Sequence, residues 1–144
     1  MKLDFWQVTD DPVEKVVTLI AKRALGEGAR LVVVSGDAEQ RATISRALWQ
    51  AGPDTFLANG ESGAPGAERQ PILLAETPQA VNGADHLILA DGVFRDCSGF
   101  ARVFLLFPPE AAPAARQAWS AQDGRDDIER AYFAQENGRW VKKR

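Results

Sequence analysis

Four short apolar runs constrain the fold of this chain more than any other feature. They occupy residues 31–34, 71–74, 86–90 and 102–107. The clearest is Leu31-Val32-Val33-Val34, which holds no polar residue. Continuous runs of Val, Ile and Leu are typical of strands covered on both faces, as in a parallel sheet. Because parallel strands need long crossover connections, usually helices, the chain is predicted to be an α/β protein.

The N-terminal third has the pattern of a strand, a helix, a strand and a second helix. Residues 3–8 alternate apolar and polar side chains, which predicts a half-buried strand. A helix is then expected to start at Asp10-Asp11-Pro12, with Glu14 completing a capping box, and to end at Gly26 and Gly28. This order is the opening of a doubly wound layer.

The remaining elements complete the same layer. The second helix is predicted to start at Asp37 and to stop near Gly52-Pro53. Residues 55–57 are predicted to form a short strand, and residues 59–70, rich in Gly, Ala, Ser and Pro, an exposed loop. A third helix is expected from Ala112 to about Gln122.

The chain is predicted to close with a β-hairpin. Residues 132–135 and 139–142 have strand composition, and Asn137-Gly138 between them is a strong hairpin-turn signal. The predicted fold is thus a single Rossmann-like three-layer domain over residues 1–144. Its sheet is mixed but mostly parallel, with helices on both faces and the hairpin at the C-terminal end.

Composition narrows the classes of function. The 144 residues are 45% hydrophobic and 26% charged, with 17 Lys and Arg against 20 Asp and Glu and a net charge of −3. A general grip on a nucleic-acid backbone needs clustered positive charge and is not expected. No segment has a signal-peptide core or a membrane-spanning run, which predicts a cytoplasmic protein without membrane contact. The single cysteine, Cys97, and the single histidine, His86, predict no metal site.

The chain lacks the usual nucleotide-binding signals. The first crossover, Thr9-Asp10-Asp11-Pro12, has no glycine and two acids that would repel phosphate. The second, Ser35-Gly36-Asp37, has one glycine, and the glycine-rich residues 60–66 are not followed by Lys-Ser/Thr. Structural roles are expected for His86, which lies beside Asp85, and for Cys97. No catalytic residue, cofactor or metal is therefore predicted. The alternative is a small nucleotide-dependent enzyme, which a phosphate bound at residues 35–37 would support.

The C-terminal quarter differs in charge from the rest of the chain. Residues 108–144 hold seven basic and six acidic side chains, a charge of +1, which leaves −4 for residues 1–107. On the third helix, Arg116, Trp119 and Ser120 share one face at positions i, i+3 and i+4. A Trp beside an Arg is a common interface pair and would suit the aromatic side chain and carboxylate of a short peptide. The other interpretation is that Trp119 packs at the edge of the core and Arg116 is solvated.

The chain resembles the chi subunit family of bacterial DNA polymerase III, part of the clamp-loader assembly, over essentially its whole length. The resemblance rests on the order and spacing of short motifs rather than on one signature. These are Phe5, Ala47-Leu48-Trp49, Phe56-Leu57, Pro71-Ile72, Leu87-Ile88-Leu89, Phe100, Arg102-Val103, Ala115-Arg116-Gln117-Ala118-Trp119, Asn137-Gly138-Arg139-Trp140 and Lys142-Lys143.

The resemblance implies a non-catalytic adaptor without a working nucleotide site. Chi-like proteins bind the acidic C-terminal tail of single-stranded DNA-binding protein, which ends in a phenylalanine carboxylate, and many bind the small psi subunit that ties them to the clamp loader. Contact with DNA would then be indirect. By this resemblance Arg116 takes the tail carboxylate and Trp119 forms the aromatic wall. A third hypothesis is an interaction module that binds another partner by strand addition at the hairpin edge.

Departures from the family pattern lower the positive charge expected around the site. Ser120 stands where the family usually has lysine, Ala118 where arginine is frequent, and Asp123 at a position that can be basic. Compensating basic residues are available in the C-terminal segment. The candidates for this rim are Arg125, Arg130, Lys142 and Lys143, with Arg144 following them.

Overall fold

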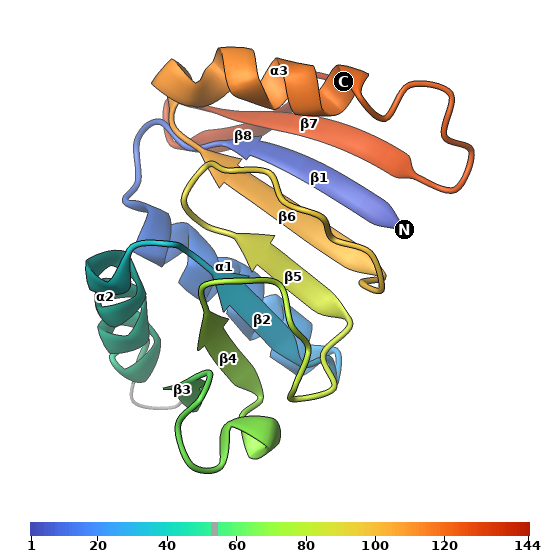
Figure 1. Ribbon diagram of the computed structural model, residues 1–144. Coiled ribbons are helices and arrows are strands. Elements are labelled where there is room, and N and C mark those ends of the chain that lie inside the picture. The colour runs from blue at the N-terminus through green and yellow to red at the C-terminus, as the bar shows by residue number, and fades with distance from the viewer. Residues whose placement is uncertain (53–54) are drawn as a thin grey trace.

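The computed structural model describes residues 1–52 and 55–144, and in that part the strands form one eight-stranded sheet of order β3-β4-β2-β5-β6-β1-β7-β8 (Figure 1). All neighbouring strands are parallel except β7 and β8, which form an antiparallel hairpin. The predicted fold class is confirmed. The strands are β1 Lys2–Gln7, β2 Leu31–Val34, β3 Asn59–Glu61, β4 Ile72–Ala75, β5 His86–Leu89, β6 Arg102–Phe107, β7 Glu129–Glu136 and β8 Arg139–Lys142.

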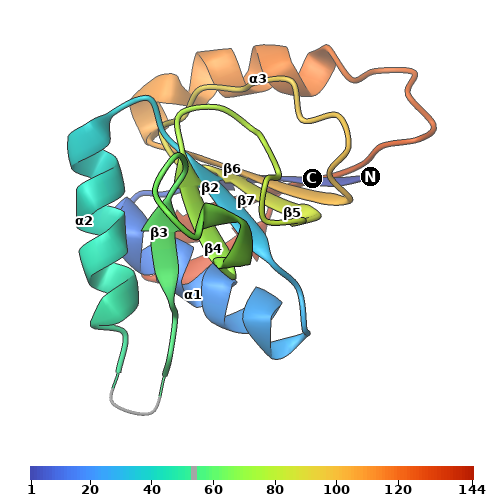
Figure 2. The same cartoon turned by 60° about the horizontal axis from the view of Figure 1, so that its bottom comes forward.

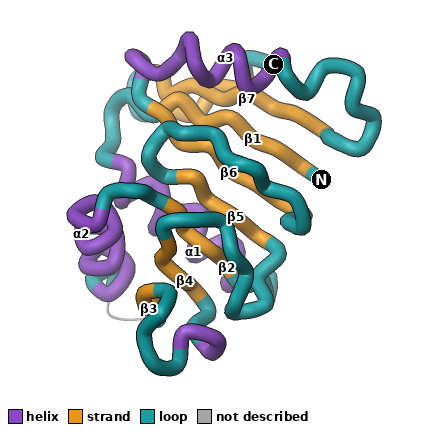
Figure 3. The backbone as a smooth tube through the Cα atoms, in the orientation of Figure 1, coloured by secondary structure: helices purple, strands orange, loops and turns teal. Residues whose placement is uncertain are grey.

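Helices lie on both faces of the sheet. The helices α1 (Val13–Gly26) and α2 (Ala38–Trp49) cover one face, and α3 (Ala112–Ser120) covers the other, over β1 and β7 (Figures 1 and 2). The long connections around β5 run over the α3 side of the sheet, as the backbone tube shows (Figure 3). Two short 3₁₀ turns, Ala67–Arg69 and Pro109–Ala111, complete the described elements.

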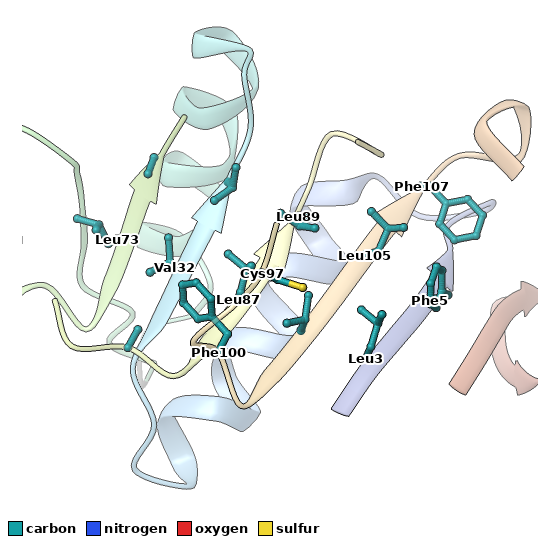
Figure 4. Packing of buried hydrophobic residues seen from close by; sticks show 14 of the residues in the cluster. Leu3, Phe5, Val32, Leu73, Leu87, Leu89, Cys97, Phe100, Leu105 and Phe107 are labelled. Carbon is teal, nitrogen blue, oxygen red and sulfur yellow. The ribbon is translucent and has the colours of Figure 1, made fainter. Parts of the chain in front are cut away.

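The two faces of the sheet carry two separate cores because successive strand residues point to opposite sides. In β1, Leu3 and Phe5 enter the core under α3, together with loop residues such as Phe100 (Figure 4). The next positions, Asp4 and Trp6, face the side of α1. The apolar runs of the sequence are thus buried on both faces, as predicted.

The first helix does not start with the predicted capping box. Pro12 occupies the N-cap position and makes no side-chain cap bond. The Asp11 carboxylate instead accepts a hydrogen bond from Gln135 Nε2 at 2.6 Å, and Gln135 Oε1 accepts the N–H groups of Thr9, Asp10 and Asp11. A buried glutamine of β7 therefore organises this turn, which local spacing did not reveal.

The predicted strand at residues 55–57 is wrong. The edge strand β3 comes later, at Asn59–Glu61, inside the segment that was predicted to be loop. Asn59 is buried there, where its side chain donates to the Leu57 carbonyl and accepts from Ser45 Oγ. These side-chain bonds and the pairing with β4 allow a polar Asn-Gly-Glu segment to form an edge strand.

The C-terminal elements follow the prediction with shifted ends. Helix α3 ends at Ser120 rather than near Gln122. The hairpin turn has φ of 52° at Asn137 and 76° at Gly138, as the favoured two-residue turn requires. Strand β7 begins earlier than predicted, at Glu129, because its residues Glu129 to Ala134 also pair in parallel with β1.

Candidate functional site

A hollow of about 350 Å³ lies between α3 and the end of the hairpin. We call it the α3 hollow. It brings together three predicted site residues of α3 with residues of β7 and of the segment that follows β8. Its lining is Arg116, Trp119, Ser120, Tyr132, Lys143 and Arg144.

The aromatic wall of the α3 hollow is fixed from below. The half-buried Trp119 ring meets Phe5 edge-on at 5.2 Å between ring centroids and Tyr132 at 6.2 Å. Phe5 is fully buried and stacks on Tyr132. Trp119 is therefore packed on the core edge and also lines the hollow, and its role toward a peptide stays a prediction.

Four cationic side chains lie at or beside the hollow, but two of them are already paired. The Arg130 guanidinium lies 4.6 Å from the Trp119 ring centroid and donates to the Trp119 carbonyl and to Asp123 at 2.9 Å. Lys143 forms an ion pair with Glu136. Arg116 and Arg144 are exposed and have no carboxylate partner among the residues that the structure describes.

The charge of the hollow acts on Tyr132. Burial raises the pKa of its phenol, and the nearby Arg116 and Arg144 guanidiniums oppose that rise. The phenol donates a hydrogen bond to Gln7 Oε1 at 2.9 Å. Tyr132 therefore stays neutral at physiological pH and contributes a fixed aromatic surface. It was absent from the predicted site, although the strand alternation in the hairpin could have indicated it.

Two of the predicted rim residues lie elsewhere. Arg125 sits in the turn after α3 and makes a two-pronged pair with Asp127, at 2.9 and 2.8 Å, and this pair lowers the pKa of Asp127 to about 2. Lys142 pairs across the hairpin with Phe133, which lines the opposite face of the sheet. Since neighbouring strand residues alternate, Lys142 and Lys143 point to opposite faces. The structure therefore does not bring the two lysines together at the α3 hollow.

The crevice where a doubly wound fold would bind phosphate is filled by the chain itself. Asp91, just after β5, accepts the Gly36 N–H at 3.0 Å and two bonds from Arg95, at 2.8 and 2.7 Å. Burial raises the pKa of Asp91, but the Arg95, Gly36 and Val93 donors outweigh it and lower that pKa. Asp37 accepts the Glu39 N–H at the start of α2. An internal carboxylate thus takes the donors that a phosphate would use.

Cys97 and His86 lie in surroundings that fit the structural roles expected for them. Cys97 is buried and its thiol pKa is raised, first by burial and then by Asp96. His86 Nδ1 contacts Asp85 Oδ1 at 2.7 Å. No group of three or more metal-ligating side chains occurs within residues 1–52 and 55–144. No helix in the described part of the chain is long and apolar enough to cross a bilayer.

A second depression of about 710 Å³ lies on the α1 face, between α1 and the hairpin. We call it the α1 groove. Its floor holds an ion pair in which Arg102 donates to the buried Asp4 at 2.8 Å. Asp4 Oδ1, Trp6 Nε1 and Arg102 Nε have no hydrogen-bond partner among the described residues. Trp140 packs on Trp6 at 4.7 Å between ring centroids and forms the hairpin side of the groove.

An exposed aromatic pair stands at the end of α2, which sequence analysis did not assign. Phe56 is 82% exposed and Trp49 is 52% exposed, and their rings meet edge-on at 6.0 Å between centroids. Among the large apolar side chains that the structure describes, Phe56 is the most exposed. Phe56 is followed directly by the buried Leu57, so the sequence shows no hydrophobic periodicity from which the exposure of Phe56 could have been predicted.

Comparison with known proteins gives one result that covers most of the fold. Residues 1–126 match the family model described as DNA polymerase III chi subunit, HolC. No curated protein matches this chain. The matched segment includes β1 to β6, α3 and the residues Arg116, Trp119 and Ser120, and it stops before β7. Because the match spans far more than half of the chain, this protein belongs to the DNA polymerase III chi subunit family, whose members are non-catalytic accessory subunits that bind single-stranded DNA-binding protein and psi in the clamp loader.

Proposed function

We propose that this chain links the DNA polymerase III holoenzyme to coated single-stranded DNA by binding the acidic C-terminal tail of single-stranded DNA-binding protein in the α3 hollow. The observation that carries the proposal is Arg116, which has no carboxylate partner among the described residues and lies beside the Trp119–Tyr132 wall. A terminal phenylalanine needs an apolar surface, and its carboxylate needs a guanidinium, which offers two parallel donors. Contact with DNA at this hollow is indirect, and the protein works in the cytoplasm.

A titration with a labelled peptide that copies the last ten or so residues of the cognate single-stranded DNA-binding protein tests this proposal. Micromolar binding that weakens with salt is expected, because the exposed ion pairs involved are screened. Arg116→Ala and Trp119→Ala should each weaken binding at least tenfold, which is about 1.4 kcal/mol. Gln117→Ala, exposed on the same helix but outside the hollow, should bind as the wild type does.

The outcomes separate this proposal from its rivals. Undisturbed binding in both variants would move the site elsewhere. Binding that survives them but fails when Trp140 or Val141 of the hairpin is changed would favour strand addition at β8, which is an edge of the sheet. A folded wild-type chain that does not bind the peptide at all would refute the proposal.

For the second family partner, psi, we propose the exposed pair Trp49 and Phe56 as the docking surface. Two adjacent aromatic side chains at 52% and 82% exposure are typical of a protein interface rather than of a free surface. The pair lies at the end of α2, away from α3 (Figure 1). A chain bound at this pair would therefore leave the α3 hollow open for the tail.

Co-purification with psi tests this second surface. Trp49→Ala and Phe56→Ala should each reduce the yield of the chi–psi complex while leaving tail-peptide binding intact. Leu19→Ala is the control, since Leu19 is also 53% exposed but lies on α1. Loss of both activities together would indicate unfolding rather than loss of a docking surface.

A further inference from the structure

The free positive charge of the α3 hollow comes from two opposite walls. Arg130 and Lys143 are committed to Asp123 and Glu136. This leaves Arg116, on α3, and Arg144, after β8, as the two guanidiniums without a carboxylate partner among the described residues that line the hollow. The match to the family model ends at residue 126, so it includes Arg116 and not Arg144.

The position of Arg144 is set by Tyr132, which forms part of the aromatic wall of the hollow. The Tyr132 N–H donates to the Arg144 carbonyl at 3.1 Å, and the Lys143 and Arg144 N–H groups donate to the Tyr132 carbonyl at 2.7 and 3.3 Å. This pairing continues the hairpin past β8. The Arg144 guanidinium lies 5.9 Å from the Trp119 ring centroid, so the backbone pairing brings a cation to the aromatic wall.

Because position 120 is a serine and carries no charge, a strongly anionic ligand needs positive charge from this second wall. Arg116 is one guanidinium and binds one carboxylate in two-pronged fashion. Ser120, four residues further along the same helix, adds no charge at the hollow. A tail with one terminal carboxylate and several acidic side chains therefore needs a second cation, and Arg144 lines the hollow without a carboxylate partner in the described part of the chain.

We infer that Arg144 is a specificity-determining residue of the α3 hollow. Arg144 binds the acidic side chains that precede the terminal phenylalanine of the tail, while Arg116 binds the terminal carboxylate. This inference rests on the proposed function, since it assigns the parts of that same ligand. Arg144 thus takes the role that a lysine at position 120 would have. The two walls therefore bind two different anionic groups of one peptide, the terminal carboxylate and the acidic side chains.

Three peptides separate these roles. The first copies the acidic tail, the second replaces its acidic side chains by the corresponding amides, and the third carries a C-terminal carboxamide. Arg144→Ala should weaken binding of the first and third peptides about fivefold and leave the second unchanged, since one exposed ion pair of ~1 kcal/mol is lost. Arg116→Ala should weaken the first and second and leave the third unchanged.

Two variants serve as controls. Lys142→Ala removes the same charge from a residue that pairs with Phe133 of the α1 groove and does not line the α3 hollow, and it should bind the first peptide as the wild type does. Arg144→Lys keeps the charge without the two-pronged geometry and should recover part of the loss. Thermal unfolding of each variant checks that the fold is kept.

The results distinguish this inference from the proposed function. If the wild type binds the first peptide and Arg144→Ala binds it equally well, the role of Arg144 is refuted and the hollow remains the tail site. If Arg144→Ala weakens all three peptides equally, Arg144 acts on the fold or on the phenylalanine pocket, and the assignment is refuted. A wild type that binds none of the peptides would refute the proposed function and this inference with it.

Discussion

The two depressions of this molecule use the same side-chain types for different purposes. The α3 hollow and the α1 groove both hold tryptophan and arginine, on opposite faces of the same strands. In the groove, the guanidinium of Arg102 is satisfied by Asp4, whose side chain is only 3% exposed. In the hollow, Arg116 has no such partner in the described chain. An arginine with an internal carboxylate stabilises the fold, whereas one without it is available for a ligand.

The difference originates in strand β1, where neighbouring positions point to opposite faces. Phe5 supports Trp119 from beneath, and Asp4 beside it neutralises Arg102. A single strand thus builds an apolar floor for one depression and an ion pair for the other. Composition alone does not distinguish the α3 hollow from the α1 groove, because an acidic residue lowers the net charge by the same amount wherever it lies in the fold.

The largest effect is expected from breaking the ion pair of the α1 groove. Arg102→Ala would leave the Asp4 carboxylate buried without its partner. Loss of one member of a buried pair costs 3–5 kcal/mol, and we expect about 3 kcal/mol here because the Arg102 side chain is 32% exposed. Urea unfolding measures this loss.

Arg116→Ala is the matched control for Arg102→Ala. The same side chain is removed, but Arg116 is exposed and has no ion-pair partner within residues 1–52 and 55–144, so the free energy of unfolding should change by less than about 0.5 kcal/mol. Equal stability losses in the two variants would contradict the division between a structural and a ligand-binding arginine.

The next effect concerns the crevice that Asp91 fills. Asp91→Asn removes the charge that Arg95 and the Gly36 N–H require, and should cost about 2 kcal/mol at neutral pH, as expected for hydrogen bonds to charged groups. Because the folded pKa of Asp91 is lowered below its usual 3.8, its contribution is fully present above about pH 4 and is lost as the pH falls through the folded value.

Acid unfolding of both proteins checks this second prediction. The stability difference between wild type and Asp91→Asn should shrink below pH 4, because the Asp91 carboxyl of the unfolded chain is protonated first and that of the folded chain only at lower pH. A difference that stays constant down to pH 2 would show that the Asp91 charge is not what holds the Gly36 turn.

The sheet could be predicted from the sequence because its signals are local. The runs at residues 31–34 and 102–107 are apolar at almost every position, and the turn at Asn137-Gly138 needs only its own two residues. Features that depend on distant contacts were missed. The capping box failed because Gln135, more than a hundred residues away, takes the Asp11 carboxylate. Strand β3 was missed because its polar residues are held by Ser45 and by β4.

The candidate site divides in the same way. Helix spacing correctly brought Arg116, Trp119 and Ser120 to one face. The other wall of the α3 hollow is formed by residues that follow β8. A shift of one residue along the hairpin decides whether a lysine faces the α3 hollow or the α1 groove. Lys142 and Lys143 are alike in composition and differ only in this register, which requires the pairing of β7 with β1 to be known.

A gain of affinity would sharpen the view of the α3 hollow as a site short of charge. Ser120→Lys adds a cation to the lining of the hollow at a position that carries no charge, and should strengthen tail binding up to about fivefold, or ~1 kcal/mol. The same change in an Arg144→Ala background should restore the lost affinity. Failure to gain in either background would indicate that charge at this edge does not limit binding.

The smallest effect is expected at Arg125, which tests whether position or net charge governs tail binding. Arg125→Ala removes the same charge as Arg116→Ala, from an exposed pair with Asp127 in the turn beyond α3. If the acidic tail responded to the net charge of −3, both variants would weaken binding equally and with the same salt dependence. Because the proposed ligand in the hollow would contact Arg116 and not Arg125, we expect less than a twofold change for Arg125→Ala. Titrations of both variants at two salt concentrations decide between local contact and long-range attraction.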